Sequence, residues 1–197
     1  MTGSKVYFDF GAHHGDGLRQ MTEILGVDGS WEIHLFEPNP FTDTRASLHD
    51  YPHPFSLTRA AIWKSSGQIA FLPQAMIDDR SPMVLGPQGF VRKPIFDGMG
   101  SAVEGVGSCE PGLGGVRVQV DAVGIADALE RTSRDDIFFK MDIEASEYDV
   151  LDVLLDHPVA ARVRGAYVEW HRLHDGSHEA RKARILAAAP FPITDWH

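Results

Sequence analysis

The sequence predicts an α/β fold with a mostly parallel central sheet and helices on both of its faces. Apolar runs of strand length alternate along the chain with segments of helical period, an order typical of strands joined by crossover helices. The first run, at 5–10, leads into a glycine turn and then into a helix. With 197 residues, the chain has the length of one domain with a single core.

The expected strands follow the apolar runs. They lie at 5–10, 31–36, 55–62, 67–72, 116–120, 136–142 and 164–169, and 191–196 is a candidate closing strand. The expected helices lie at 15–26, 42–50, 123–131, 145–156 and 177–189. In the helix at 145–156, Tyr148, Leu151 and Leu155 recur at spacings of three and four. This spacing gives the helix one apolar face that can pack on the sheet.

The region 73–115 interrupts this alternation. It is rich in glycine and proline, and it also contains apolar residues such as Met76, Phe90 and Phe96. Long loops within compact domains are often lids or binding loops, and a purely solvated loop needs no such apolar side chains. We therefore expect a single domain, residues 1–197, in which the insertion 73–115 is a substrate lid. A surface insertion without a role is the alternative.

Composition excludes several classes of partner. The formal charge is −10 with the histidines neutral, which opposes binding to a nucleic-acid backbone. The single cysteine, Cys109, cannot form an intramolecular disulfide, which is consistent with a reducing compartment. No apolar run approaches the roughly 18 residues of a membrane span, and no apolar stretch of signal length stands between the first residue given and the first strand. We expect a cytoplasmic protein with no nucleic-acid or membrane partner, and no feature defines an oligomeric state.

The first two expected strands end in a candidate nucleoside site. Glycines follow the first strand at Gly11, Gly15 and Gly17, and the second strand stops at Glu37. Glycine lets bare backbone approach a ligand, and a carboxylate at the second strand end can bind the hydroxyls of a ribose. The spacing differs from the dinucleotide fingerprint G-x-G-x-x-G. Asp9 would attract a cationic sulfonium or amine, so the pattern favours S-adenosylmethionine over NAD.

A second polar cluster is expected where the strands at 136–142 and 164–169 end. Lys140, Asp142 and Glu144 alternate along the first, and Glu169 and His171 follow the second. Ligands of open α/β sheets bind outside these carboxyl ends. The cluster can supply a general base, and carboxylates can bind a divalent cation. A metal is therefore possible but unsupported, because such groups also hydrogen-bond to one another or to a substrate.

Together these segments resemble the FkbM-type S-adenosylmethionine-dependent methyltransferases. The resemblance is carried by Asp9-Phe10-Gly11-Ala12-His13-His14-Gly15, Phe36-Glu37-Pro38-Asn39-Pro40, Ala60-Ala61-Ile62 with Gly67, and Phe139-Lys140-Met141-Asp142-Ile143-Glu144-Ala145-Ser146-Glu147-Tyr148. It extends from Val6 to about His171. Two positions depart from the family pattern, since His13 stands where Asn is usual and Ala145 where Gly is usual.

The resemblance implies a Rossmann-like class I methyltransferase fold with a seven-stranded sheet, and methyl transfer to a hydroxyl of a small molecule or sugar. Carried over by position, the expected donor site consists of Asp9, Gly11 and Gly15 beside the methionine portion, Glu37 at the ribose, and Ala61 and Ile62 at the adenine. Ala12, His13 and Pro38 are also expected to bind the donor. Lys140, Asp142, Glu169 and His171 would face the acceptor. We expect Asp142 or His171 as the general base and Lys140 as an orienting group. The antiparallel strand pair that closes this fold is expected to be incomplete.

Two other functions stay open on the sequence. One is a non-catalytic protein of the same fold that binds an adenosyl ligand. The other is a nicotinamide-dependent oxidoreductase, which the glycine spacing disfavours.

Overall fold

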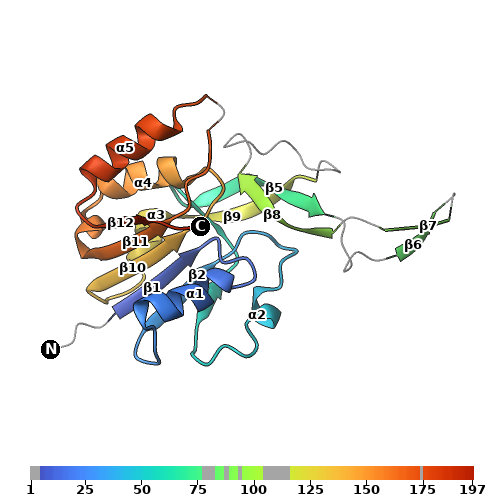
Figure 1. The fold of residues 1–197 in the computed structure, drawn as a ribbon, viewed down its shortest axis with the longest axis horizontal. Helices are drawn as coiled ribbons and strands as arrows, with labels where there is room; N and C mark the ends of the chain where they lie inside the picture. The colour runs from blue at the N-terminus through green and yellow to red at the C-terminus, as the bar shows by residue number, and fades with distance from the viewer. Residues whose placement is uncertain (1–4, 77–82, 87–88, 93–94, 104–115, 174) are drawn as a thin grey trace.

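The computed structural model describes residues 5–76, 83–86, 89–92, 95–103, 116–173 and 175–197 (Figure 1). A main sheet carries helices on both faces, and a smaller sheet extends away from one end of it. The α/β class expected from the alternation of strands and helices is thus confirmed.

The main sheet has six parallel strands within the described residues, in the order β12-β11-β10-β1-β2-β3. Their bounds are β1 (Lys5–Phe10), β2 (Glu32–Phe36), β3 (Ser56–Thr58), β10 (Asp136–Met141), β11 (Val163–Val168) and β12 (Ile193–Asp195). The apolar strands β1 and β10 lie at its centre, as expected where both faces are covered. The described residues form six strands here and not seven, and β12 joins β11 in parallel instead of adding an antiparallel pair.

Helices cover both faces of this sheet. They are α1 (Asp16–Leu25), α2 (Thr44–Ser47), α3 (Ile125–Leu129), α4 (Glu147–Leu155) and α5 (His178–Ala188), and a 3-10 turn, η1 (Pro158–Arg162), follows α4. On one face, α1 buries Leu18 and Met21 against Tyr7. On the other, α3, α4 and α5 pack against Val6 and Phe8, which alternate with Tyr7 along β1. In Figure 1, α1 therefore lies below the sheet, and α4 and α5 lie above it.

Two expected elements differ from the structure. The helix expected at 42–50 is limited to Thr44–Ser47, because the backbone then tightens and the N–H of His49 bonds to the carbonyl of Ala46. The strand expected at 55–62 is two strands in two sheets. A turn at Thr58, whose carbonyl accepts from the N–H of Ala60, separates β3 from β4 (Ala61–Trp63).

The smaller sheet has the order β4-β9-β5-β8. Besides β4 it contains β5 (Gly67–Met76), β8 (Ile95–Val103) and β9 (Val118–Gly124), and a separate hairpin consists of β6 (Met83–Gly86) and β7 (Gly89–Arg92). Parallel pairing of β4 with β9 and antiparallel pairing of β9, β5 and β8 hold it together.

The insertion 73–115 was interpreted as a loop, and this was wrong for its described residues. They include the end of β5 and all of β6, β7 and β8. Proline is usually excluded from a strand interior, but Pro73 lies where the pairing of β5 with β8 shifts register, between Leu72 and Gln74. An irregularity of this kind accommodates a residue without an N–H. The rest of the insertion lies outside the described residues.

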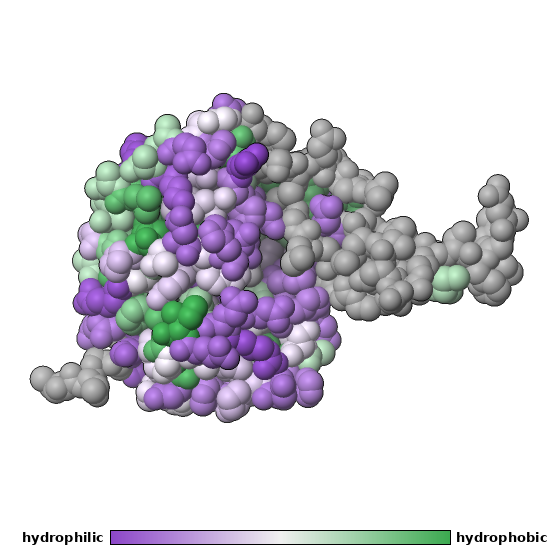
Figure 2. All heavy atoms as spheres, in the orientation of Figure 1, coloured by the Kyte–Doolittle hydropathy of each residue, from purple (hydrophilic) through white to green (hydrophobic). Residues whose placement is uncertain are grey.

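The face in Figure 2 is mostly hydrophilic over the described residues, and its hydrophobic side chains occur in small groups. Among the residues whose side chains are described, the exposed large apolar ones are Ile24, Phe41, Met83 and Leu186. Among the helices of the described chain, none is long and apolar enough to span a bilayer.

Candidate active site

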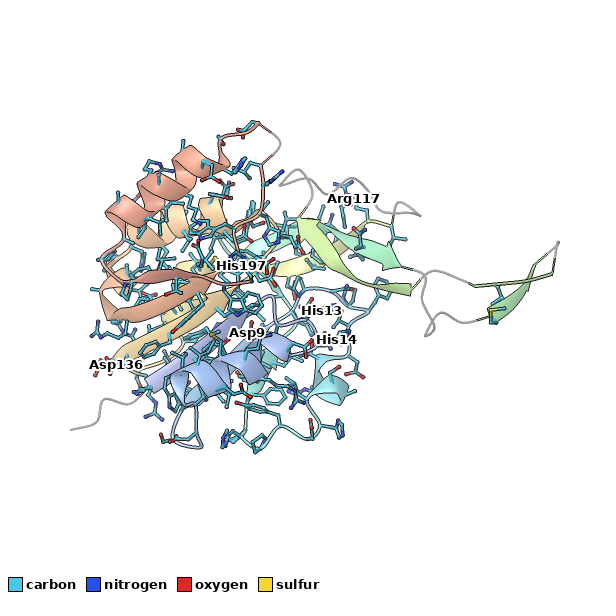
Figure 3. The ribbon with its side chains drawn as sticks, viewed as in Figure 1. Asp9, His13, His14, Arg117, Asp136 and His197 are labelled. Atoms are coloured by element: carbon cyan, nitrogen blue, oxygen red, sulfur yellow. The ribbon has the colours of Figure 1, made fainter. Side chains whose placement is uncertain are left out.

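A cavity of about 340 Å³ lies between the carboxyl ends of the main-sheet strands and the smaller sheet. The main sheet contributes the segments after β1, β2, β10 and β11, and the smaller sheet contributes an apolar wall of Ala61, Ile62, Phe71 and Val103. Figure 3 shows His13 in the loop after β1, on the side facing the smaller sheet, with Asp136 at the opposite end. The cavity thus occupies the place where open α/β sheets bind ligands.

The glycine turn after β1 packs tightly against its neighbours. Gly11 has a φ of 81°, and a Cβ there would lie 1.8 Å from the carbonyl oxygen of Asp142. Gly15 has a φ of 90°, and a Cβ there would lie 2.5 Å from the side chain of Leu48. Both positions therefore require glycine for conformation and for space. The missing side chains make room for the chain itself, and Gly11 also lines the cavity.

Glu37 ends β2 with its carboxylate fixed toward the cavity. It is 4 % exposed, its Oε2 accepts from the N–H of His13 at 2.7 Å, and its Oε1 accepts from the N–H of Asn39 at 2.7 Å. Burial raises the pKa of Glu37 to about 7, although the two backbone N–H groups act in the opposite direction. Each oxygen retains a lone pair, so the carboxylate can accept two further hydrogen bonds from a ligand.

Lys140 joins the glycine turn to the end of β10. Its Nζ donates to the carbonyl oxygen of Gly11 at 2.8 Å, lies 3.4 Å from both Asp9 and Asp142, and sits 4.6 Å from the centre of the Trp196 ring. Burial would lower the pKa of Lys140, but the two carboxylates outweigh it and raise the pKa above its usual value. The ammonium is therefore a fixed cation and not a proton acceptor.

His171 lies among four carboxylates. Its Nδ1 is 3.0 Å from Glu147, and its Nε2 faces Glu144 at 3.2 Å, Asp142 at 3.8 Å and Glu169 at 3.8 Å. Burial would lower the pKa of His171, but the hydrogen bond with Glu147 and the nearby carboxylates raise it to about 9. Glu147 begins α4, and it also holds the histidine.

Most residues that the sequence assigned to the site line the cavity. The exceptions among these predicted residues are Asp9, Gly15 and His171. Asp9 is fully buried and faces Lys140, because the two residues pair in register on adjacent strands. Asp9 therefore does not line the cavity, and its carboxylate faces the ammonium of Lys140 instead. His171 stands behind Asp142, Glu144 and Glu169, which do line the cavity.

Several lining residues were not predicted. Phe71, Val103 and Trp196 reach the cavity from strands remote in sequence, and no local pattern marks them. Asn39 directly follows the Glu37-Pro38 pair and accepts a bond from the N–H of Phe41, so its place beside Glu37 could have been inferred. Val103 belongs to the insertion 73–115, which thus supplies part of the cavity wall.

A parallel sheet with a buried carboxylate at its second strand end and a cavity at its strand ends is typical of α/β folds that bind a nucleotide-type ligand. The sequence model of the methyltransferase FkbM domain family matches residues 9–187. The chain therefore belongs to this family. Among curated proteins and among solved structures, none matches the chain. The family resemblance seen in the sequence is thus confirmed.

Proposed function

We propose that the chain transfers a methyl group from S-adenosylmethionine to a hydroxyl oxygen of a small molecule or sugar. The observation that carries this proposal is Glu37, whose carboxylate lies at the end of β2, is fixed by two backbone N–H groups and lines the cavity. This is the place and the chemistry that bind both hydroxyls of a ribose. Membership of a methyltransferase family supports the choice of donor.

The donor would extend along one side of the cavity. Ala61 and Ile62 of β4, with Phe71 of β5, offer an apolar surface for adenine. The backbone of the turn from Gly11 to His13 lies on the other side of Glu37 and would border the methionine portion. When bound, S-adenosylmethionine supplies an electrophilic methyl group on a sulfonium.

The acceptor would lie against the ends of β10 and β11. Asp142 and Glu169 line the cavity there, and Asp142 is our candidate for the residue that accepts the hydroxyl proton. Lys140 orients it, because its Nζ lies 3.4 Å from Oδ2 of Asp142 and also holds the carbonyl of Gly11. The rate of a methyl transfer depends mainly on alignment of the acceptor oxygen with the methyl carbon. Lys140 supports this alignment because it holds the glycine turn of the donor site and the proton acceptor, Asp142, in fixed positions.

The insertion 73–115 is proposed to cover the acceptor. Val103, which pairs with Phe71, shows that the insertion reaches the cavity on its donor side, and apolar residues elsewhere in the insertion are suited to exclude water from the reaction. The acidic character of the chain supports a small acceptor in preference to a nucleic acid.

Methyl transfer is tested by incubating the protein with S-adenosylmethionine and a panel of hydroxylated metabolites and sugars, followed by mass spectrometry. A gain of one methyl group on an acceptor, together with formation of S-adenosylhomocysteine, is the expected result. Tight donor binding with no methylated product from any hydroxylated compound would instead identify a non-catalytic binding protein.

A further inference from the structure

The side chains around His171 form a donor set for a divalent cation. One ligand atom from each of Asp142, Glu144 and His171 lies within 4.8 Å of the other two. Neighbouring ligand atoms around a cation with bond lengths of roughly 2.0–2.2 Å lie about 3 Å apart. The 3.2 Å between Nε2 of His171 and Glu144 matches that spacing, and the 3.8 Å to Asp142 is close to it.

The histidine is oriented as a metal ligand would be. Its Nδ1 lies 3.0 Å from Oε1 of Glu147, which is fully buried, and its carbonyl oxygen accepts from the hydroxyl of Tyr148 at 2.8 Å. Histidines that bind metals usually donate the second ring N–H to a carboxylate in this way, which leaves the other nitrogen for the cation. Here that other nitrogen, Nε2, points at the three carboxylates, and a cation bound there would displace its proton.

Glu147 provides an independent sign that this cluster needs a further positive charge. Its Oε2 is buried and has no hydrogen-bond partner within the described part of the chain, while its Oε1 accepts from the N–H of Ile143 at 3.0 Å and lies 3.0 Å from Nδ1 of His171. A buried carboxylate with one oxygen unpaired is costly unless a nearby cation balances it. Among the described side chains, only the imidazole of His171 and the ammonium of Lys140, whose Nζ lies 3.4 Å from Asp142, face Glu147 and these three carboxylates, so the acidic groups outnumber the basic ones.

The cluster also opens toward the cavity. Asp142, Glu144 and Glu169 line it, so a cation held between them would keep a coordination position for an oxygen of another molecule. A purely structural ion would be enclosed by protein ligands on all sides. This position is the acceptor side of the proposed methyl transfer.

We propose that Asp142, Glu144 and His171, with Glu169 beside them, bind one divalent cation of the Mg²⁺ or Mn²⁺ type, and that Glu147 positions His171 for it. The carboxylates, which form the larger part of this ligand set, suit Mg²⁺ and Mn²⁺. The inference deepens the proposed function and rests on it in one respect, because the cation would hold the hydroxyl oxygen of the acceptor. On this inference, the acceptor is a molecule whose hydroxyl oxygen can bind a metal ion.

Calorimetric titration of the full chain with MnCl₂, in the absence of S-adenosylmethionine, tests the site. We expect one Mn²⁺ per chain and at least tenfold weaker binding by Glu144→Gln, which removes a ligand charge. The matched control is Glu23→Gln, an exposed acid on α1, and it should bind like the wild type. No Mn²⁺ binding by the wild type, or equal binding by Glu144→Gln, would overturn the inference.

Two further variants test the roles of the histidine and its partner. Electron spin-echo spectra of bound Mn²⁺ should show modulation by an imidazole nitrogen, and His171→Gln should abolish it. Glu147→Gln should weaken Mn²⁺ binding by roughly tenfold or more, as is typical for such supporting carboxylates. A spectrum without imidazole modulation would remove His171 from the site.

Donor binding separates this inference from the proposed function. Glu144→Gln and Glu147→Gln should bind S-adenosylmethionine as the wild type does, because Glu37 belongs to the opposite side of the cavity, and this result also shows that both variants are folded. Donor binding and methyl transfer without Mn²⁺ binding would overturn the metal site alone. Mn²⁺ binding without donor binding would overturn the proposed function alone.

Discussion

The carboxylate of Glu37 is held in place before any ligand arrives, because its two oxygens are fixed by the N–H groups of His13 and Asn39. Hydrogen bonds to a charged group contribute about 1.5 to 3 kcal/mol. Glu37→Ala should therefore weaken S-adenosylmethionine binding by roughly tenfold to a hundredfold, measured by calorimetry at pH 8. Glu23→Ala, on the surface of α1, is the control. Unchanged affinity in Glu37→Ala would remove this residue from the ribose site.

Burial of Glu37 also predicts how stability depends on pH. Its pKa is raised to about 7 in the folded state, whereas an unfolded glutamate titrates near 4.3. The folded chain thus binds more protons between these values, and the contribution of Glu37 to stability falls as pH rises through 7.

The variant Glu37→Gln lacks this titration. Linkage predicts that the free energy of unfolding of the wild type, relative to Glu37→Gln, decreases by about 2 to 3 kcal/mol between pH 5 and pH 8. Urea unfolding at the two pH values measures it, and the other titrating groups cancel in the difference. A constant difference would contradict a buried carboxylate at this position.

Asp142 has a different role from Glu37, although both line the cavity. It lies at the end of β10 beside Lys140 and not at the ribose position. Asp142→Asn should reduce turnover by at least about a hundredfold, in the range typical of a lost general base, and leave the dissociation constant of S-adenosylmethionine within about twofold. A variant that keeps its rate would exclude Asp142 as the proton acceptor.

At the scale of elements, the loop between β10 and α4 has an unusual backbone. Glu144 has a φ of 56° and Ala145 a φ of 73°, in the left-handed region that costs a residue with a Cβ about 1–2 kcal/mol. Ala145 stands where the family usually has glycine, which adopts this region freely. The turn projects Glu144 back toward His171.

Replacing Ala145 by glycine tests this strain. Relief of the strain should offset the lost buried methyl group, so Ala145→Gly should change the free energy of unfolding by less than about 0.5 kcal/mol. The matched control is Ala128→Gly, since Ala128 is also buried but lies in α3, and it should cost at least about 1 kcal/mol. Equal losses in urea unfolding would show that the backbone at Ala145 is not strained.

Elements that depend on local pattern could be predicted, and those that depend on pairing could not. The strands β1 and β10 are continuous apolar runs, and their structure agrees with the expectation. The run at 55–62 looks equally continuous, but Thr58 pairs with β2 and Ala61 with β9. Only long-range contacts decide this division. The strands within 73–115 were missed because glycine and proline obscure strand periodicity.

The residues that line the cavity also divide into those that a local pattern predicts and those that depend on pairing between strands. Glu37, Asp142 and Glu169 could be placed from the rule that ligands bind at strand ends. Trp196 could not, because it reaches the cavity only through the pairing of β12 with β11. The burial of Asp9 beneath Lys140 follows from the neighbouring positions of β1 and β10, and strand order is not visible in a sequence.

At the scale of the whole molecule, the cavity lies between two sheets that have separate hydrogen-bond networks. Its lining comes from both, with Glu37 and Asp142 on the main sheet and Ile62, Phe71 and Val103 on the smaller one. A donor that contacts both sheets should therefore stabilise the molecule as a unit, because it binds only when the two are correctly placed.

This coupling predicts a ligand-specific shift in melting temperature. At a hundred times its dissociation constant, a ligand that binds only the folded chain stabilises it by about 2.7 kcal/mol, which corresponds to roughly 5 to 10 °C for a domain of this size. S-adenosylmethionine should produce this shift, and NAD should not, since the glycine turn lacks the dinucleotide spacing. Glu37→Ala should lose most of the shift at the same concentration. A comparable shift with NAD would identify the nicotinamide-dependent alternative, because the same cavity would then be accommodating a dinucleotide.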